Sequence, residues 1–256
     1  MKPVVLLYHD VVRSELRDEV GFPGALAARY KLEPAAFEKH LDAIAGTGRS
    51  VGLPLEQSPP DVVLTFDDGG SSARAAASAL EARGWKGVFF VTTSKIGSRG
   101  FLDEADITAL ADRGHIIGSH SHSHPTYMGK LPPAEIKQEW RQSRAALGDI
   151  LGEPPDVASV PGGFVSRDVV REAAAAGYRA LMTSEPRTGP RLREGLAAYG
   201  RFAVWSTTPA ERAAAYASGV RPAQLRLWLE WKAKDVAKRG NPSAYQALRR
   251  LRSRIS

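Results

Sequence analysis

The chain has 256 residues, of which 43% are hydrophobic and 25% charged, an ordinary globular composition with enough length for one large domain. It contains no cysteine, so disulfides, thiolate catalysis and sulfur-ligated zinc are excluded, and any metal must be held by His, Asp, Glu or backbone oxygen. The net charge of +7 is concentrated in residues 221–256, where ten Lys and Arg residues accompany two acidic residues.

The first residues, MKPVVLLYHD, contain one Lys and a short apolar run that ends at Tyr8. Such a run is too short for the core of a signal peptide or for a membrane span. We therefore expect a cytoplasmic protein that reaches a membrane surface, if at all, through its basic segment.

Short apolar runs alternate with helical patterns over the first 220 residues. Strands are predicted at seven places, residues 4–7, 62–66, 87–91, 115–118, 157–160, 179–182 and 202–205. Helices are predicted at six, residues 35–45, 72–84, 104–114, 133–151, 166–177 and 208–218, and residues 13–34 form a loop long enough to fold over a site. Strands that alternate with helices favour a parallel α/β architecture.

The C-terminal segment is basic and helical in pattern. Pro222 is expected to begin a helix that ends near Gly240, and Asn241 with Pro242 to begin another. The second helix has an apolar stripe surrounded by arginines, namely Arg249, Arg250, Arg252 and Arg254. A solvated helix packed on the rest of the protein is one interpretation, and binding to a membrane surface or an anionic substrate is another. No segment has the pattern of a nucleic-acid-binding module, so we expect no nucleic-acid partner.

Polar clusters follow four of the predicted strands. YHD follows the first strand, FDDG the second, SHSHSHP the fourth and VPGG the fifth. In parallel α/β sheets the carboxyl ends of the strands gather on one face, which is where binding and catalytic sites are built. We therefore expect these clusters to form one site.

Two histidines and two carboxylates in these clusters have the pattern of a catalytic metal site. His120 and His124 are four residues apart, which places two imidazoles on one side of a helical turn, and Asp67 or Asp68 supplies a third ligand. Three protein ligands leave a position for water, as in sites for Zn²⁺ or a similar divalent ion. Because adjacent strand residues point to opposite faces, we expect one carboxylate to bind the metal and the other to accept a proton from the metal-bound water.

At these motifs the sequence resembles the polysaccharide deacetylase family, carbohydrate esterase family four. The resemblance covers roughly the first two hundred residues, through LLYHDVV, VVLTFDDGG, GVFFVTT, GHIIGSHSHSHP and VPGGFVSRDVV, and its most specific part is TFDDG together with GSHxxSHP. It implies an α/β fold, a distorted seven-stranded β/α barrel over residues 1–220, followed by a basic amphipathic helical extension over residues 221–256.

The resemblance also implies an activity, the metal-dependent hydrolysis of N-acetyl, less often O-acetyl, groups. By position Asp67 is the general base, and a divalent metal, expected to be Zn²⁺, is held by Asp68, His120 and His124. Gly162, after Pro161, lies where the family uses a backbone N–H to help hold the tetrahedral oxyanion.

Two family features are missing from the sequence. Ser159 begins the third motif, where the family usually has an Arg, and Gly162 replaces the aromatic residue after the proline. The late Leu-x-His motif that supplies the usual general acid is absent, because no His follows His124. His9 is our candidate for that proton donor or for a substrate contact, and Arg201 is the candidate to replace the missing Arg.

The remaining histidines have structural interpretations. For His9 and Asp10 the alternative to a chemical role is a satisfied hydrogen-bonding pair under the loop. His122 is interpreted as a spectator, His115 as packed within a strand, and His40 as an exposed helical residue.

The predicted function is removal of N-acetyl groups from an amino sugar, an oligosaccharide or a glycan precursor. A lipid-linked or nucleotide-linked saccharide fits the basic segment, which would be attracted to a phosphate or a membrane surface. One alternative is a deformylase or an amidase that acts on a non-sugar acylamine. Another is a catalytically silent, metal-holding carbohydrate-binding protein, which the missing acid and the missing Arg favour.

Overall fold

The structure is a computed structural model, which describes residues 2–54, 58–163 and 165–240. The helix predicted to begin at Asn241 lies outside the described residues. Within them, no helix is long and apolar enough to cross a membrane.

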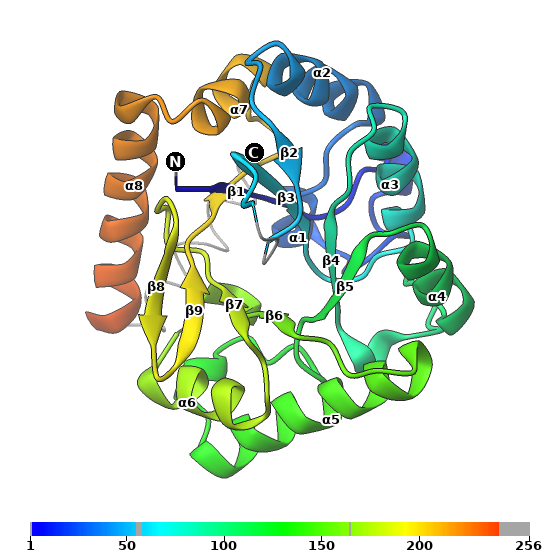
Figure 1. The fold of residues 1–256 in the computed structure, drawn as a ribbon, viewed down its shortest axis with the longest axis vertical. Helices are drawn as coiled ribbons and strands as arrows, with labels where there is room; N and C mark the ends of the chain where they lie inside the picture. Colours follow the sequence, from blue (N-terminus) through cyan, green and yellow to red (C-terminus); the bar gives the residue numbers. More distant parts are fainter. Residues whose placement is uncertain (1, 55–57, 164, 241–256) are drawn as a thin grey trace.

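One curled, mostly parallel sheet forms the centre of the molecule (Figure 1). Its order is β10-β1-β3-β4-β5-β6-β7-β9-β8, with β2 paired to β3 beside this path, and among these described strands only β8 and β9 pair antiparallel. The strands are β1 (Val4–Tyr8), β2 (Val51–Gly52), β3 (Val62–Phe66), β4 (Val88–Val91), β5 (Ile116–Ser119), β6 (Val157–Ser159), β7 (Ala180–Met182), β8 (Pro190–Arg193), β9 (Leu196–Tyr199) and β10 (Phe202–Ala203). All seven predicted strands form, and the predicted distorted barrel is a half-barrel whose sheet path ends at β10 and β8.

Helices surround the sheet on its outer side (Figure 1). They are α2 (Pro34–Ala45), α3 (Ala73–Glu81), α4 (Glu104–Asp112), α5 (Pro133–Leu151), α6 (Arg167–Ala175), α7 (Ala210–Ala217) and α8 (Arg221–Gly240), whereas the short α1 (Ala25–Ala28) belongs to the loop between β1 and α2. Local caps help to set their bounds: Asp103 and Asp106 form a capping box on α4, and the Ser166 hydroxyl accepts a hydrogen bond from the N–H of Val169 at the start of α6. The helices that connect the strands thus begin and end close to where the sequence predicts.

The register between β1 and β3 determines which residues meet at the site. Val4 is opposite Val62 and Tyr8 is opposite Phe66, so both strands end at the same level. The N–H of Asp67 donates to the carbonyl of Tyr8 at 3.0 Å, which continues the pairing one step further. His9 and Asp67 therefore leave neighbouring strands side by side.

The centre of the sheet is buried on both faces, as expected for parallel strands covered by helices. All five residues of β1 and all five of β3 are buried. Gly118 in β5 is required by close packing, because a Cβ there would lie 2.6 Å from the ring of Phe90. This rigid layer supports the loops that follow the strands.

His40 is buried, contrary to the prediction that it is an exposed helical residue. Only 1% of its surface is exposed. Its Nε2 lies 2.9 Å from the carbonyl of Thr208, and the Tyr8 hydroxyl lies 3.4 Å from its Nδ1. The periodicity of α2 does not reveal this burial, because the cover comes from the segment before α7, far along the chain.

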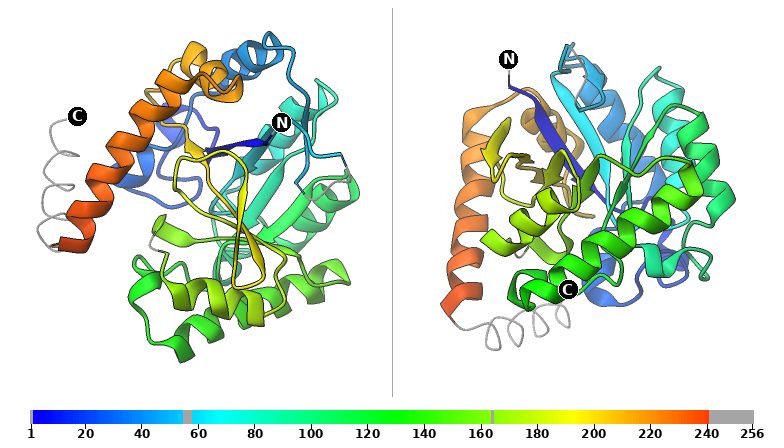
Figure 2. Two further views of the ribbon diagram at one scale, coloured as in Figure 1. Left: turned by 60° about the vertical axis from the view of Figure 1, so that its left-hand side comes forward. Right: turned by 60° about the horizontal axis from the view of Figure 1, so that its bottom comes forward.

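The start of α8 packs on the barrel. Leu227 is 7% exposed and belongs to the same apolar cluster as Tyr216 and Ala217 of α7. Figure 2 shows α8 as a long helix along one side of the molecule, continuing from α7. The predicted helix that begins near Pro222 and ends near Gly240 is therefore confirmed, whereas a domain boundary at residue 220 stays a prediction.

Glu81, at the end of α3, connects α3 to the segment between α4 and β5. Arg113 donates to both of its carboxylate oxygens, at 2.9 and 2.7 Å. The Nδ1 of His115 accepts from the N–H of Gly87, so the His115 Nε2–H donates to Glu81 at 2.9 Å. Hydrogen bonding by Arg113 lowers the pKa of Glu81 to about 2.

Glu81→Gln is expected to make the stability of the protein less dependent on pH in the acidic range. The folded-state pKa of Glu81 is below its unfolded value of 4.5, so its contribution is complete above that pH and is lost as the pH falls toward about 2. Urea unfolding should show the variant about 1 kcal/mol less stable at pH 7 and the difference shrinking below pH about 4.5. Exposed Glu153→Gln is the control; a pH-independent difference for Glu81→Gln would contradict the prediction.

Candidate metal centre

Asp68 turns away from β3 through an uncommon backbone conformation. Its φ is +80°, in the left-handed region that residues other than glycine rarely adopt, and Ser121 and His124 also have positive φ, at 64° and 59°. Such backbone strain persists where the surrounding structure enforces it, and it concentrates at functional sites. Asp68 lies in the loop after β3, and Ser121 and His124 lie in the loop after β5. These two loops contain the predicted metal ligands.

The side chains of Asp68, His120 and His124 converge. Asp68 Oδ1 lies 3.4 Å from His120 Nε2 and 3.5 Å from His124 Nε2, and one ligand atom from each residue lies within 4.8 Å of the others. Ligand atoms bound at about 2.0–2.1 Å around a tetrahedral ion are separated by about 3.3–3.4 Å. The two Asp–His separations therefore suit a divalent ion.

Two further observations support this fit. Asp68 Oδ1 is buried and has no hydrogen-bond partner among the described residues, as expected for an atom that serves as a metal ligand. The Nδ1–H of His120 donates to the carbonyl of Ser159 at 3.0 Å, which leaves Nε2 as the free nitrogen facing Asp68. Burial would raise the pKa of Asp68, but His120 and His124 outweigh it and hold that pKa well below its usual value.

Asp67, the predicted base, is held by Arg201. The guanidinium donates to the two carboxylate oxygens at 2.7 and 2.8 Å, and both side chains are almost completely buried. Burial favours a higher pKa for Asp67, but the Arg201 charge, together with His120, lowers it below the usual value. Asp67 is therefore ionised and oriented, as a proton acceptor must be.

Arg201 is itself fixed by hydrogen bonds from three directions. Its Nε donates to the carbonyl of Thr183 at 3.1 Å, and its terminal nitrogens reach Thr65 Oγ1 at 3.2 Å and Ser159 Oγ at 2.7 Å. Ser159 Oγ then donates to Asp67 Oδ2 at 3.1 Å. The position of the carboxylate thus depends on residues from four separate strand ends.

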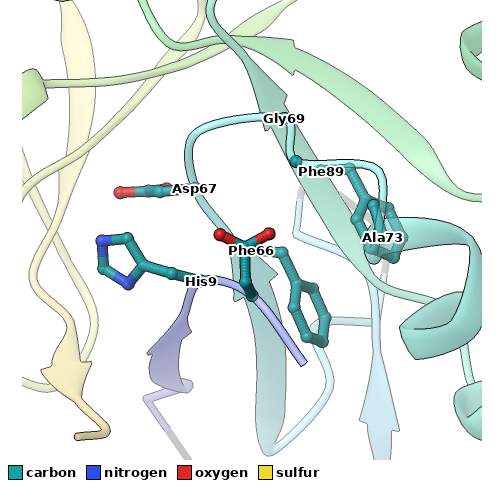
Figure 3. Close-up of a pocket in the computed structure, with 8 residues that line it drawn as sticks. His9, Phe66, Asp67, Gly69, Ala73 and Phe89 are labelled. Carbon is teal, nitrogen blue, oxygen red and sulfur yellow. The ribbon is translucent and has the colours of Figure 1, made fainter. Parts of the chain in front are cut away.

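His9 lies beside this pair at the end of β1. Figure 3 shows the His9 and Asp67 side chains extending to the same side, away from Phe66 and Phe89. Within the described part of the chain, His9 Nδ1 is buried and has no hydrogen-bond partner, so the alternative of a satisfied His9–Asp10 pair is not what the structure contains. Burial lowers the pKa of His9, opposed by the charges of Asp68 and Asp67.

Comparison with known proteins identifies the family. A model of the polysaccharide deacetylase family matches residues 55–181, which include Asp67, Asp68, His120 and His124. The chain belongs to the polysaccharide deacetylase family.

Curated relatives of this chain include two bacterial proteins. YxkH of Bacillus subtilis, named for the same family, is 27% identical over 179 residues, which is 66% of this chain and 63% of YxkH. Peptidoglycan-N-acetylglucosamine deacetylase PgdA of Listeria monocytogenes is 28% identical over 174 residues, which is 64% of this chain and 35% of PgdA. The chain thus spans less than two thirds of the length of either relative.

Solved structures confirm the fold. A polysaccharide deacetylase from Bacillus cereus superposes with a TM-score of 0.70 at 21% identity, covering 85% of this chain and 69% of that one. The deacetylase PplD of Streptococcus pyogenes gives 0.68 at 20% identity, covering 82% and 96% of the two chains. The half-barrel is therefore the architecture that this chain shares with them.

The presence of Ser159 in place of the usual Arg of the third motif has a structural explanation. Ser159 is small and fully buried, and its hydroxyl contacts the guanidinium of Arg201 beside Asp67. Arg201 lies in the turn between β9 and β10. The candidate Arg201 is thus in contact with the predicted base. Sequence reasoning noted Ser159 only as a missing Arg and did not predict that its hydroxyl and carbonyl contact Asp67 and His120.

Pro161 and Gly162 lie in a 3-10 turn, η4 (Pro161–Gly163), directly after Val160. Pro161 is buried, whereas Gly162 is exposed with φ +63°. The turn begins two residues after Ser159, at the end of β6, so it borders the site. The role of the Gly162 N–H toward an oxyanion stays a prediction.

Proposed function

We propose that this chain is a metal-dependent hydrolase that removes N-acetyl groups from an amino sugar or glycan precursor. The observation that carries the proposal is the adjacency of two unlike carboxylates. Asp68 faces two imidazoles in a ligand set, and Asp67 is kept ionised next to it by a buried guanidinium. The three ligands suit Zn²⁺, the ion we propose, since nitrogen and carboxylate ligands with an open position are typical of catalytic zinc sites.

Each residue has a role in this proposal. A divalent ion held by Asp68, His120 and His124 would polarise the acyl carbonyl and make a water acidic enough to attack it. Asp67 accepts the proton of the attacking water, since it is ionised and its orientation is set by Arg201. His9 donates a proton to the departing amine, and the backbone of Gly162 donates to the developing oxyanion.

The substrate class rests on the relatives and on charge. PgdA is named for N-acetylglucosamine of peptidoglycan, and a B. subtilis relative that is 29% identical is named for N-acetylmuramic acid of peptidoglycan. We propose an acetylated amino sugar of this kind, free, polymeric, or as a lipid-linked or nucleotide-linked precursor. Among these substrates, the basic segment favours a lipid-linked or nucleotide-linked precursor. We therefore propose a cytoplasmic enzyme at the membrane periphery.

An acyl-donor panel tests the proposed function. Purified protein, stripped of metal with a chelator and reloaded with Zn²⁺, is given N-acetylated, N-formylated and O-acetylated sugars and non-sugar acylamines, and the released acid is measured. The proposal is supported if the zinc-loaded protein releases acetate from N-acetyl sugars and the chelator-treated protein does not. Release of formate alone, or cleavage of non-sugar amides alone, would reassign the site, and no turnover of any acylated amine would favour a silent binding protein.

His9→Gln tests the proton donor. Gln keeps a polar side chain of similar size but cannot transfer a proton, so kcat for N-acetyl hydrolysis should fall about 100-fold. The affinity for Zn²⁺ should stay unchanged, because His9 does not belong to the ligand set. Single-turnover acetate release and metal titration measure the two quantities. An unchanged kcat in the variant would show that another group donates the proton.

Removal of residues 241–256 tests the role of the basic segment. Among the described residues, α8 exposes Leu225 and Leu229 one turn apart, with Arg226 between them. The removed segment contains four arginines, and each contributes about 1 kcal/mol to the free energy of binding an anionic surface. The shortened chain should bind vesicles of phosphatidylserine and phosphatidylcholine roughly 100-fold less tightly in a sedimentation assay. Equal binding of the full and the shortened chain to these vesicles would refute an electrostatic membrane contact. The same conclusion would follow if the full chain bound equally well to vesicles of phosphatidylcholine alone.

A further inference from the structure

A loop between β1 and α2 closes on itself around one buried lysine. At its base, the N–H of Val12 donates to the carbonyl of Leu32 at 2.8 Å and the N–H of Leu32 to the carbonyl of Asp10 at 3.0 Å. Lys31, next to this base, is 2% exposed. The loop is therefore a compact unit whose interior contains a charge.

The ammonium of Lys31 uses its three N–H donors on loop carbonyls. Nζ donates to the carbonyls of Arg17 at 2.6 Å and Phe22 at 2.7 Å, and also to that of Val20. A lysine ammonium has three donors and no acceptor, so its hydrogen-bonding capacity is filled. Carbonyl groups from three separate positions in the loop are thereby hydrogen-bonded to one nitrogen atom.

Asp10 supplies the counter-charge and connects the loop to the turn after the TFDD motif. Its Oδ2 lies 3.8 Å from Lys31 Nζ, and its Oδ1 accepts from the Ser72 hydroxyl at 2.8 Å. Glycines pack directly against this carboxylate, since a Cβ at Gly21 or Gly70 would lie 2.2 or 2.0 Å from one of its oxygens. The ion pair is thus enclosed by the loop on one side and by the site-bearing turn on the other.

This loop places one aromatic ring against each of two site histidines. The Phe22 ring lies 4.6 Å from the ring of His124, and the Tyr30 ring lies 4.5 Å from that of His9. The carbonyl of Phe22 is one of the three bound by Lys31, and Tyr30 is the residue before Lys31 in the chain. One anchor therefore positions both aromatic rings.

We propose that Lys31 is a positioning residue, whose anchoring of the loop orients His124 for metal binding and His9 for proton transfer. The proposal rests on the proposed function for the identity of the metal ligand and the donor. The contacts connect one loop to two histidines of the site. His9 Nδ1 has no hydrogen bond within the described residues, so the tilted contact with the Tyr30 ring is what restrains the orientation of its ring. The ring of His124 is partly exposed and is covered by Phe22.

Lys31→Met tests this proposal, because Met keeps the length of the side chain and removes all three donors. The control is Lys39→Met, at an exposed position of α2. We expect a roughly tenfold loss of Zn²⁺ affinity and a roughly tenfold fall in kcat with KM changed less, as for other residues that orient metal ligands. Amide hydrogen exchange should rise in residues 12–31 and stay unchanged in β3, β4 and β5.

Metal affinity and hydrogen exchange are measured without substrate, so they decide the role of Lys31 even if no N-acetyl sugar is hydrolysed and the proposed function fails. Unchanged Zn²⁺ affinity and unchanged loop exchange in folded Lys31→Met would overturn the proposal. A uniform rise of exchange over the whole chain would also overturn it, since that result means a general structural role.

Two ring variants keep the proposal testable if Lys31→Met does not fold. Phe22→Leu should weaken Zn²⁺ binding, and Tyr30→Leu should lower kcat while leaving Zn²⁺ affinity intact, because each ring contacts a different histidine. Equal effects of both variants on metal affinity, or an effect of neither, would contradict a separate orientation of the two histidines.

Discussion

Asp67→Asn is expected to reduce acetate release by about 10²–10⁴-fold while the protein still binds metal, because the amide cannot accept the proton of the attacking water. The proposed metal ligands are the neighbouring Asp68 and the two histidines, so the proposed ligand set is unchanged in this variant. Acetate release with saturating N-acetyl sugar and metal content of the same sample are the two measurements. The combination separates a lost base from a lost metal.

Asp149→Asn, at an exposed position of α5, is the matched control and should keep full activity. Loss of metal in Asp67→Asn would mean that Asp67 belongs to the ligand set. Near-normal turnover with metal retained would mean that another group accepts the proton, and the proposed mechanism would be wrong.

Arg201→Met is expected to lower stability by about 3–5 kcal/mol and activity by about 100-fold or more. Removing one member of a buried ion pair leaves the other charge uncompensated, here the carboxylate of Asp67. The same loss frees that carboxylate from two hydrogen bonds that orient it, and a small displacement of a catalytic group has a large effect on rate. Urea unfolding and kcat measure the two effects, with exposed Arg141→Met as the control.

Two related variants show whether the effect acts through Asp67. Arg201→Lys keeps the charge but not the planar pair of donors, so it should recover part of the stability and little of the activity. In the double variant Asp67→Asn with Arg201→Met, the stability losses should be strongly non-additive, because the two side chains are in direct contact. Additive losses would show that Arg201 stabilises the fold independently of the base.

The sequence predicted the centre of the sheet and the polar clusters that converge at its edge. The runs that became β1 and β3 are almost entirely apolar because parallel strands are buried on both faces. The polar clusters directly after such runs had to meet on one face, since the carboxyl ends of parallel strands are adjacent. That rule and the spacing of His120 and His124 predicted a site with Asp67 or Asp68, and the choice of Asp68 came from the family resemblance. The structure brings Asp68, His120 and His124 together.

Other elements escaped prediction for local reasons. The residues of β8 are all exposed and two of them are arginines, so the strand has no apolar pattern. The hairpin turn between β8 and β9 consists of Glu194 and Gly195, both with positive φ, a conformation in which Glu is uncommon. β2 has only two residues, too few for any periodicity.

Sequence by itself determined which polar residues follow the strands and are candidates for the chemistry, because residue type and position after a strand are local properties. Tertiary structure decided how those residues are held. Arg201 and Asp67 are 134 positions apart, and their contact requires the sheet to bring β10 beside β1 and β1 beside β3. The burial of Lys31 under its own loop likewise depends on carbonyls that have no sequence signal, because every residue has one. Long-range contacts of this kind leave no periodicity in the chain, which is why Arg201 was only a candidate from the sequence and its contacts with Asp67 and Ser159 are seen only in the structure.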